Sequence, residues 1–220
     1  MSMIKKGILL ILVCVLLVII VRSSTSKQTD SEVTLQHTNE TATVQAESDD
    51  PLIVAKIPNA QFSTIQEALD NAKPGDTILV REGVYNEKIE WNTSGTKNAP
   101  ITLKNFTDEN PIIEPRGTTY KDFVALNGEW QIIDGFEIRN GWDGIVVNGS
   151  HNIVRNNYIH NNGDSCVVKE FCGQGILVVS AHDILIENNR IEQNGLTNYS
   201  PWHVHGIYLS DYYKKVCPIL

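Results

Sequence analysis

Three polar residues recur at a constant spacing, each directly before a glycine that opens an aliphatic phrase. Asp143, Gln174 and His205 follow one another at intervals of 31 residues and precede Gly-Ile pairs. In stacked coils of that length they would form a column, with neighbours about 4.8 Å apart. An imidazole is suited to proton transfer near neutral pH, and a nearby carboxylate can orient it or hold a cation. We therefore predict His205 and Asp143 as catalytic residues; an ordinary turn role is the commoner alternative.

Aromatic side chains accompany this column and favour a carbohydrate-binding groove. Trp142 and Trp202 lie beside the same edge of the repeat, while Tyr208 falls in the next column outward. Aromatic rings offer large flat apolar faces, which can stack on the faces of sugars. We predict Trp142, Trp202 and Tyr208, together with Gln174, as substrate-binding residues.

Other basic side chains are further candidates. Lys169 lies in a long connection, 164–174. Such connections often carry function, so Lys169 could supply a catalytic base, with a solvated loop charge as the alternative. His203 and His205 alternate as some metal-binding pairs do, but no third ligand is evident and we predict no metal site. His151 and His182 also recur at 31 residues, in a turn where a structural role is expected.

The elements that must position these residues are short strands that repeat along the chain. One phrase covers 144–147, 175–178 and 206–209, and a second covers 152–159 and 183–191, with a looser copy at 131–141. Each run alternates large aliphatic side chains, as a strand with one buried face does, and Asn and Gly separate the runs at corners. Stacked coils of this kind form a parallel β-helix, in which the amides of Asn157 and Asn189 would bond along the stack. Neither the hairpin turns of a β-sandwich nor the shorter period of leucine-rich repeats is present.

A helix is predicted before the first coil. Ser63 and Gln66 form a capping-box pair, apolar residues fall on one face, and Pro74-Gly75 ends the helix, which gives a helical cap over 63–73. A strand follows at 77–80. An amphipathic helix here would cover the open apolar end of the first coil.

At these positions the sequence resembles bacterial right-handed β-helix proteins, among them pectate-lyase-like and alginate- or chondroitin-lyase-like polysaccharide lyases. The resemblance covers about residues 55–210 and rests on Phe62-Ser63-Thr64-Ile65-Gln66-Glu67-Ala68, Pro74-Gly75-Asp76-Thr77-Ile78, Gly83-Val84-Tyr85, Ser94-Gly95-Thr96 and Ala99-Pro100-Ile101-Thr102. It implies a right-handed parallel β-helix solenoid and extracellular or periplasmic work on acidic polysaccharide, often with calcium and a Lys or Arg base. This sequence shows no cluster of Asp residues on adjacent coils and no Lys or Arg in the column.

Composition divides the 220 residues into three parts. Residues 1–22 have two lysines ahead of a 15-residue apolar run and are predicted to be a signal peptide or membrane anchor. Residues 23–50 are polar and predict a disordered spacer, and 51–220 form the β-helix domain. The formal net charge of −8 argues against nucleic acid, since no basic stripe exists to neutralise phosphates. We predict a monomer that acts on polysaccharide.

The cysteines and the end of the chain add two expectations. An exported setting permits a Cys166–Cys172 disulfide, which leaves Cys217 unpaired. The last coil breaks off in 212–220 without a further corner or cap, so we predict a truncated solenoid. Three functions compete: a lyase-like enzyme, a non-catalytic surface solenoid that binds glycans or other surface partners, and an inactive truncated product.

Overall fold

The computed structural model describes residues 50–115, 123–163, 172–195 and 205–210, all within the compact unit Glu47–Leu220. Four of the residues discussed above, Cys166, Lys169, Trp202 and His203, lie outside these ranges. So do residues 1–49 and the tail 211–220. Within the described ranges, no helix has both the length and the hydropathy needed to cross a bilayer.

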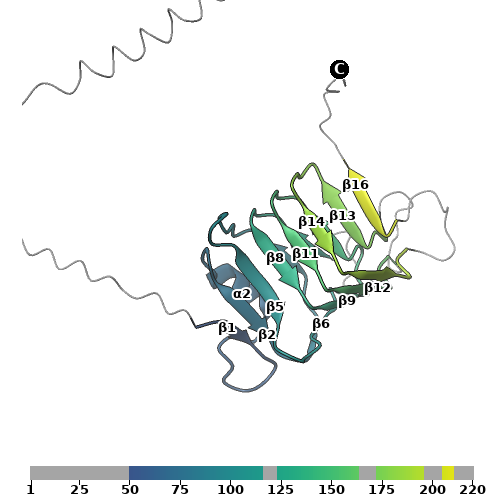
Figure 1. Ribbon diagram of the computed structural model, residues 1–220. Helices are drawn as coiled ribbons and strands as arrows, with labels where there is room; N and C mark the ends of the chain where they lie inside the picture. The colour runs from purple at the N-terminus through teal and green to yellow at the C-terminus, as the bar shows by residue number, and fades with distance from the viewer. Residues whose placement is uncertain (1–49, 116–122, 164–171, 196–204, 211–220) are drawn as a thin grey trace, which may run out of the picture. The chain divides into compact units, whose positions relative to one another are not determined.

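The described strands form three parallel sheets, and the chain visits the sheets in the same order on every turn (Figure 1). Sheet A contains β1 (Leu52–Val54), β2 (Thr77–Val80), β5 (Ile101–Asn105), β8 (Gln131–Asp134), β11 (Ile153–Arg155) and β14 (Leu185–Glu187). Sheet B contains β3 (Val84–Tyr85), β6 (Ile112–Ile113), β9 (Glu137–Arg139), β12 (Tyr158–His160) and β15 (Arg190–Glu192). Sheet C contains β4 (Ile89–Trp91), β7 (Val124–Leu126), β10 (Ile145–Val147), β13 (Ile176–Val179) and β16 (Ile207–Ser210). The predicted parallel β-helix is confirmed.

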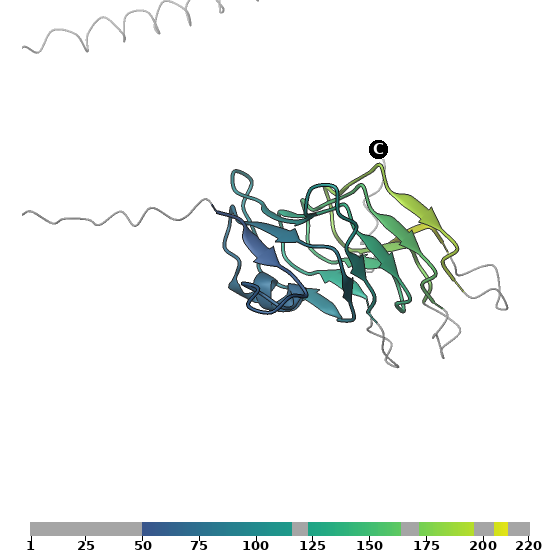
Figure 2. The same ribbon diagram turned by 90° about the horizontal axis from the view of Figure 1, so that it is seen from below.

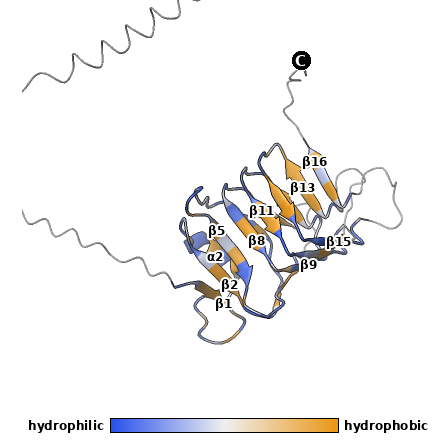
Figure 3. Ribbon diagram, in the orientation of Figure 1, coloured by the Kyte–Doolittle hydropathy of each residue, from blue (hydrophilic) through white to orange (hydrophobic). Residues whose placement is uncertain are grey.

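The core consists of aliphatic side chains that stack in columns from coil to coil. Ile133 on β8 pairs with Val154 on β11, and both are fully buried. Ile138 and Ile159 repeat the arrangement on sheet B. Figure 3 shows the strands of sheet A largely in hydrophobic colours and many of the corners in hydrophilic ones. Each such burial contributes about 1.5–3 kcal/mol, so the columns are the main source of stability.

Asparagine ladders hold the corners between sheets A and B. The side-chain amide of Asn157 donates to Asn189 Oδ1 at 3.0 Å, and Asn157 Oδ1 accepts from the backbone N–H of Phe136 at 3.0 Å. The predicted bonding between Asn157 and Asn189 is confirmed. At the next corner, Asn162 donates to Asn194 in the same way at 2.8 Å. Each amide thus satisfies buried backbone groups of its neighbours, which would otherwise be costly.

The repeated glycines are required by close approach of neighbouring coils. A Cβ on Gly144 would lie 2.4 Å from the carbonyl oxygen of Gly175, and one on Gly175 would lie 2.5 Å from that of Gly206. Those carbonyls accept the N–H groups of Ile145 and Ile176. The Gly-Ile phrases therefore mark the positions where the backbones of consecutive coils nearly touch.

A short helix covers the first coil, although its cap differs from the expectation. α2 spans Ile65–Asn71 and packs against β1, β2 and β4 (Figure 2). The N-cap is Thr64, whose hydroxyl accepts from the N–H of Glu67, so the predicted Ser63–Gln66 capping box is wrong. The carboxylate of Glu87 accepts the N–H groups of Ile65 and Gln66 at 3.0 Å, which satisfies two further helix donors.

The opposite end of the described stack is more exposed. Leu185 on β14, and Ile207 and Leu209 on β16, are 46%, 45% and 72% exposed. Leu209 pairs with the buried Val178 on β13, so it continues a core column onto the last described coil. The predicted truncation concerns residues 212–220, outside the described ranges, and stays a prediction.

A first prediction tests the asparagine ladder by comparing two positions in the same solenoid. Asn157→Ala leaves the buried N–H of Phe136 and the carbonyl of Ile133 without their side-chain partner. We expect it to lower the free energy of unfolding by about 2–4 kcal/mol in urea titrations.

The control is Asn148→Ala, since Asn148 bonds Asn127 in the same ladder fashion but is exposed. Its loss should be below about 1 kcal/mol, because water replaces the bond. Equal losses at the two positions would contradict the role given to the buried ladder.

Candidate functional site

The predicted polar column lies along the edge where the chain enters sheet C. Strands β10, β13 and β16 pair in register, which aligns the residues two positions ahead of each: Asp143, Gln174 and His205. Asp143 Oδ1 accepts the N–H of Gln174 at 2.8 Å, and Gln174 Oε1 accepts the N–H of His205 at 2.9 Å. Each side chain therefore holds the backbone of the next coil, and the two bonds lead from Asp143 to His205.

Asp143 is buried, and burial changes its acidity. Its residue is 3% exposed. Loss of solvation raises the pKa of Asp143 to about 7, although the backbone N–H groups of Gln174 and Gly173 act in the opposite direction. A carboxyl with a pKa near neutrality can exchange a proton under physiological conditions. Its burial, however, allows it to act on a ligand only through the neighbouring coil.

The exposed part of the column is its last member. His205 and Tyr208 are exposed, and their rings stack with centroids 5.0 Å apart at an interplanar angle of 20°. Trp142 is only 5% exposed, and Gln174 is buried. Among the described site candidates, His205 and Tyr208 are thus the side chains that face solvent.

Long connections converge on this edge. Residues 114–123, 161–175 and 193–206 each lead from sheet B to sheet C, whereas Gly135 and Phe136 alone separate β8 from β9. Lys169 and Trp202 belong to two of these long connections but lie outside the described residues. The chain order therefore places both candidates in segments that start and end beside the column.

The outer face of sheet B carries a charged and aromatic row that the sequence interpretation missed. Arg139 bonds Glu114 at 2.5 Å and Glu137 at 2.6 Å, and His160 Nε2 lies 3.1 Å from Glu137. The ring of His160 stacks on Tyr158 at 4.0 Å. The available signal was the pattern of the strands Glu-Ile-Arg, Tyr-Ile-His and Arg-Ile-Glu, in which the central Ile faces the core and the flanking residues face out.

This row neutralises its own charges. Tyr158 donates to Glu192 at 2.6 Å, and that bond raises the pKa of the phenol, so Tyr158 is protonated at neutral pH and is a poor base. Arg190 bonds the same carboxylate at 2.8 Å. Because each described cation here already contacts a carboxylate, the row links coils rather than offering a free positive charge to a substrate.

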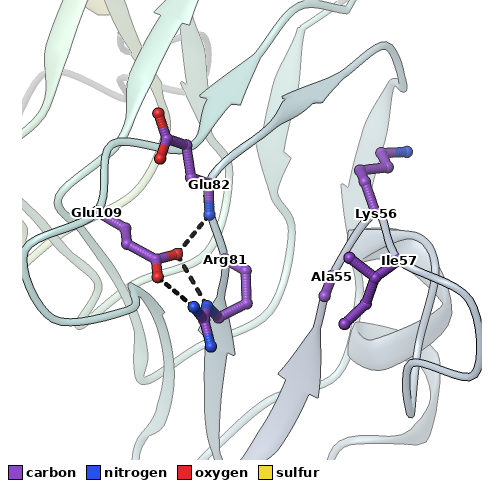
Figure 4. A pocket seen from close by; sticks show the side chains of 6 residues that line it. All are labelled: Ala55, Lys56, Ile57, Arg81, Glu82 and Glu109. Carbon is purple, nitrogen blue, oxygen red and sulfur yellow. Dashed lines mark hydrogen bonds and ion pairs between the residues drawn. The ribbon is translucent and has the colours of Figure 1, made fainter.

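A shallow pocket of about 230 Å³ lies near the α2 end of the stack. Figure 4 shows Lys56, Ala55 and Ile57 on one wall and an ion pair between Arg81 and Glu109 on the other. The Arg81–Glu109 distance is 2.6 Å, and the bond from Arg81 lowers the pKa of Glu109. This wall is internally paired, which favours a structural role.

The histidines at the corner between sheets C and A are arranged differently from the expectation. Ile153 pairs with Leu185, a spacing of 32 residues, so His151 is in register with Asp183 rather than with His182. The predicted stacking of His151 on His182 at a spacing of 31 is therefore off by one position. The physical reason is a corner that is one residue longer between β13 and β14 than between β10 and β11.

The calcium implied by the sequence resemblance can be compared with the side chains in place. Calcium takes six to eight oxygen ligands. Among the described residues, the potential metal-binding group of three or more side chains is His151, His182 and Asp183, with two imidazoles. The described part of the chain does not fit a calcium site.

One cysteine expectation can be followed in part. Cys172 is buried and disulfide-bonded. Its expected partner, Cys166, lies outside the described residues. The pairing itself stays a prediction.

Comparison with known proteins finds a family match over most of the described solenoid. The family described as "Pel9A-like, right handed beta helix region" matches residues 55–200. The match confirms the right-handed sense expected from the sequence. YwoF, an uncharacterized protein of Bacillus subtilis (strain 168), is 30% identical over 113 residues, 44% of this chain and 24% of its own length. Pectate lyase L of Paenibacillus polymyxa (strain SC2) is 27% identical over 109 residues, 46% of this chain and 24% of its own length.

Two solved structures are also similar. Alginate lyase from Paenibacillus sp. str. FPU-7 has a TM-score of 0.49 at 22% identity, covering 66% of this chain and 54% of that one. Pectate lyase Pel9A has a TM-score of 0.42 at 18% identity, covering 61% and 40%. The matched region thus spans about a quarter of the length of the two curated relatives and about half of these structures.

A second prediction concerns the buried carboxyl of the column. Because the folded pKa of Asp143 is raised, the folded state holds a proton that the unfolded chain releases. The stability that this proton contributes is fully present below about pH 4 and is lost as the pH rises toward 7. Asp143→Asn keeps a neutral acceptor for the N–H of Gln174 and should be more stable than the parent at pH 8, by on the order of 3 kcal/mol.

The measurement is urea unfolding of both proteins from pH 4 to pH 8. The difference between them should be small at pH 4 and grow toward pH 8. A constant difference across this range would show that Asp143 does not titrate with a raised pKa.

Proposed function

Because the chain belongs to the family of Pel9A-like right-handed β-helix proteins, we propose that it is a polysaccharide lyase that cleaves an acidic polysaccharide by β-elimination. The observation that carries the proposal is the family match over residues 55–200, which includes nearly all of the described coils. The relationship to Pectate lyase L supports an acidic sugar chain as the substrate class.

The chemistry needs one base and an environment that tolerates negative charge. In β-elimination a base removes the proton from C5, next to the sugar carboxylate. The C4–O bond to the next sugar then breaks, a C4=C5 double bond forms, and the leaving oxygen takes up a proton. A side chain with a pKa near the working pH is best suited to the proton transfer.

His205 is the proposed base. It is exposed, and its unprotonated imidazole can accept the C5 proton and later release it. Tyr208, which stacks on His205, offers a face to a sugar ring. Both residues belong to one coil, so the base and the stacking ring keep a fixed spacing.

Asp143 and Gln174 have positioning roles in this proposal. Their side chains accept the N–H groups of the following coils and so fix the backbone that carries His205. Asp143 therefore acts through Gln174 and not on the substrate itself. Trp142 is buried beside Asp143 and supports the same edge.

Lys169 and Trp202 complete the proposal from the adjoining connections. A lysine beside the groove would neutralise a sugar carboxylate and lower the cost of the carbanion-like transition state. Trp202 would add a second stacking ring. Calcium is given no step here, because the described side chains do not assemble an oxygen-rich site for it.

The proposal includes export. The basic and apolar residues 1–22 would direct the chain across the membrane and, if retained, anchor it, with 23–50 as a spacer. The β-helix domain, 51–220, would then meet polysaccharide outside the cell as a monomer. An acidic chain of net charge −8 would bind a polyanion through local cations rather than through its overall field.

A non-catalytic glycan-binding solenoid is the second candidate. It is favoured by the coil-to-coil bonds of Asp143 and Gln174, which commit two polar members of the column to structure. Under this alternative, Tyr208 and its neighbours would bind a sugar chain without cleaving it.

A third prediction separates the two. The full-length protein, incubated with pectate, alginate or chondroitin, with and without added calcium, should yield unsaturated products that absorb ultraviolet light. His205→Ala should lower kcat by at least about 100-fold, the usual contribution of a general base.

The matched control is His160→Gln, a histidine on the outer face of sheet B that has no part in the proposed site. It should retain the parental rate if circular dichroism shows an intact fold. Full activity of His205→Ala would remove His205 as the base. Retention of polysaccharide in affinity electrophoresis without any unsaturated product would favour the binding function.

A further inference from the structure

Three successive coils place a polar or aromatic residue at the same corner between sheets C and A. Trp130, His151 and Asp183 each lie two positions ahead of the register set by Ile132, Ile153 and Leu185. All three have a left-handed backbone, with φ of 57°, 61° and 55°. The same conformation at the same position directs their side chains to one side of the corner.

The contacts along this corner are close. The rings of Trp130 and His151 stack with centroids 4.2 Å apart and an interplanar angle of 8°. On the other side of His151, its Nδ1 lies 3.6 Å from Asp183 Oδ2. The indole therefore fixes the plane of the His151 ring and leaves its edge directed toward the next coil.

The longer corner between β13 and β14 adds a second imidazole to the same place. His182 precedes Asp183, and its Nδ1 lies 3.0 Å from the same Asp183 Oδ2. The rings of His151 and His182 are 5.1 Å apart and perpendicular. Backbone bonds fix both residues, since the N–H of His151 donates to the carbonyl of His182 and the N–H of His182 to Ser150 Oγ.

The spacing of these atoms matches a metal coordination shell. In a tetrahedral zinc site with bonds of about 2.0–2.1 Å, neighbouring ligand atoms lie about 3.3–3.4 Å apart. The two distances to Asp183 Oδ2, 3.0 and 3.6 Å, fall on either side of that value. One ligand atom from each of the three side chains lies within 4.8 Å of the other two. Small rotations of the side chains would complete the geometry.

We propose that His151, His182 and Asp183 form a binding site for a divalent transition-metal ion of the zinc class, with water in the remaining position. Two imidazoles and one carboxylate suit zinc, cobalt or nickel, whereas calcium requires a shell of oxygen atoms. The stack of Trp130 on His151 supplies the outer support that metal-bound histidines need. The side chains of His182 and Asp183 are 69% and 70% exposed, so an ion can enter from solvent.

The ion would join two coils of the solenoid. His151 precedes β11 and the other two ligands precede β14, so the metal crosslinks the coils that end near the exposed edge of the described stack. An ion that binds only the folded state lowers the unfolding constant about 100-fold at a concentration 100 times its Kd. The site is thus a clamp that does not depend on the lyase chemistry, and it stands or falls separately.

A fourth prediction tests the clamp by metal titration of the full-length chain freed of metal with a chelator. Zinc chloride should bind with about one ion per chain in calorimetry and raise the midpoint of thermal unfolding, while calcium chloride should not compete. Cobalt(II) should give the intense visible absorption of a four-coordinate ion. His182→Ala and Asp183→Asn should each weaken zinc binding at least about tenfold; Asn tolerates the left-handed backbone at position 183.

Two control variants separate this site from others that hold imidazoles. His160→Gln removes an imidazole that contacts one carboxylate, Glu137, and His205→Ala breaks the alternating pair with His203. Both should bind zinc as the parent does. The proposal is overturned if the parent shows no heat and no thermal shift with zinc, or if His205→Ala abolishes binding that His182→Ala leaves intact.

Discussion

The structure depends on one constraint: a polar group that points along the solenoid axis must find its partner on the next coil. Backbone groups meet this requirement through the three parallel sheets, whose strands pair in register from coil to coil. At the corners side chains supply the partners, as Asn157 does for Phe136 and Asn189 for Asn157. Because an unpaired buried group costs about 1–3 kcal/mol, these bonds fix the register as firmly as the aliphatic core does.

The same constraint decides which polar residues remain available for chemistry. Asp143 and Gln174 bond forward to the next coil and are buried. The charged row on sheet B bonds in a similar way, through Arg139, Glu137 and His160. His205 follows the last of these forward bonds and is exposed, so it combines a fixed backbone with a free ring. A solenoid edge can therefore hold a reactive side chain rigidly without surrounding it.

Much of the fold followed from residue types at regular spacing. The Gly-Ile phrases and paired Asn corners were legible because sterics and buried amides leave few alternatives at those positions. Details that depend on one residue more or less were not. The cap at Thr64 rather than Ser63, and the pairing of His151 with Asp183, each reflect a shift that periodicity cannot resolve. The outward row of sheet B was missed because a lone central Ile marks the buried face and says nothing of contacts across it.

The central claim, that the chain eliminates across a glycosidic linkage of an acidic polysaccharide, is tested most directly by the products formed in heavy-oxygen water. Elimination takes no oxygen from solvent, so each cut should give one unsaturated end and one unlabelled reducing end by mass spectrometry. Incorporation of the heavy oxygen at the new ends would identify hydrolysis, and polysaccharide of unchanged length would show no cleavage; either result would contradict the account.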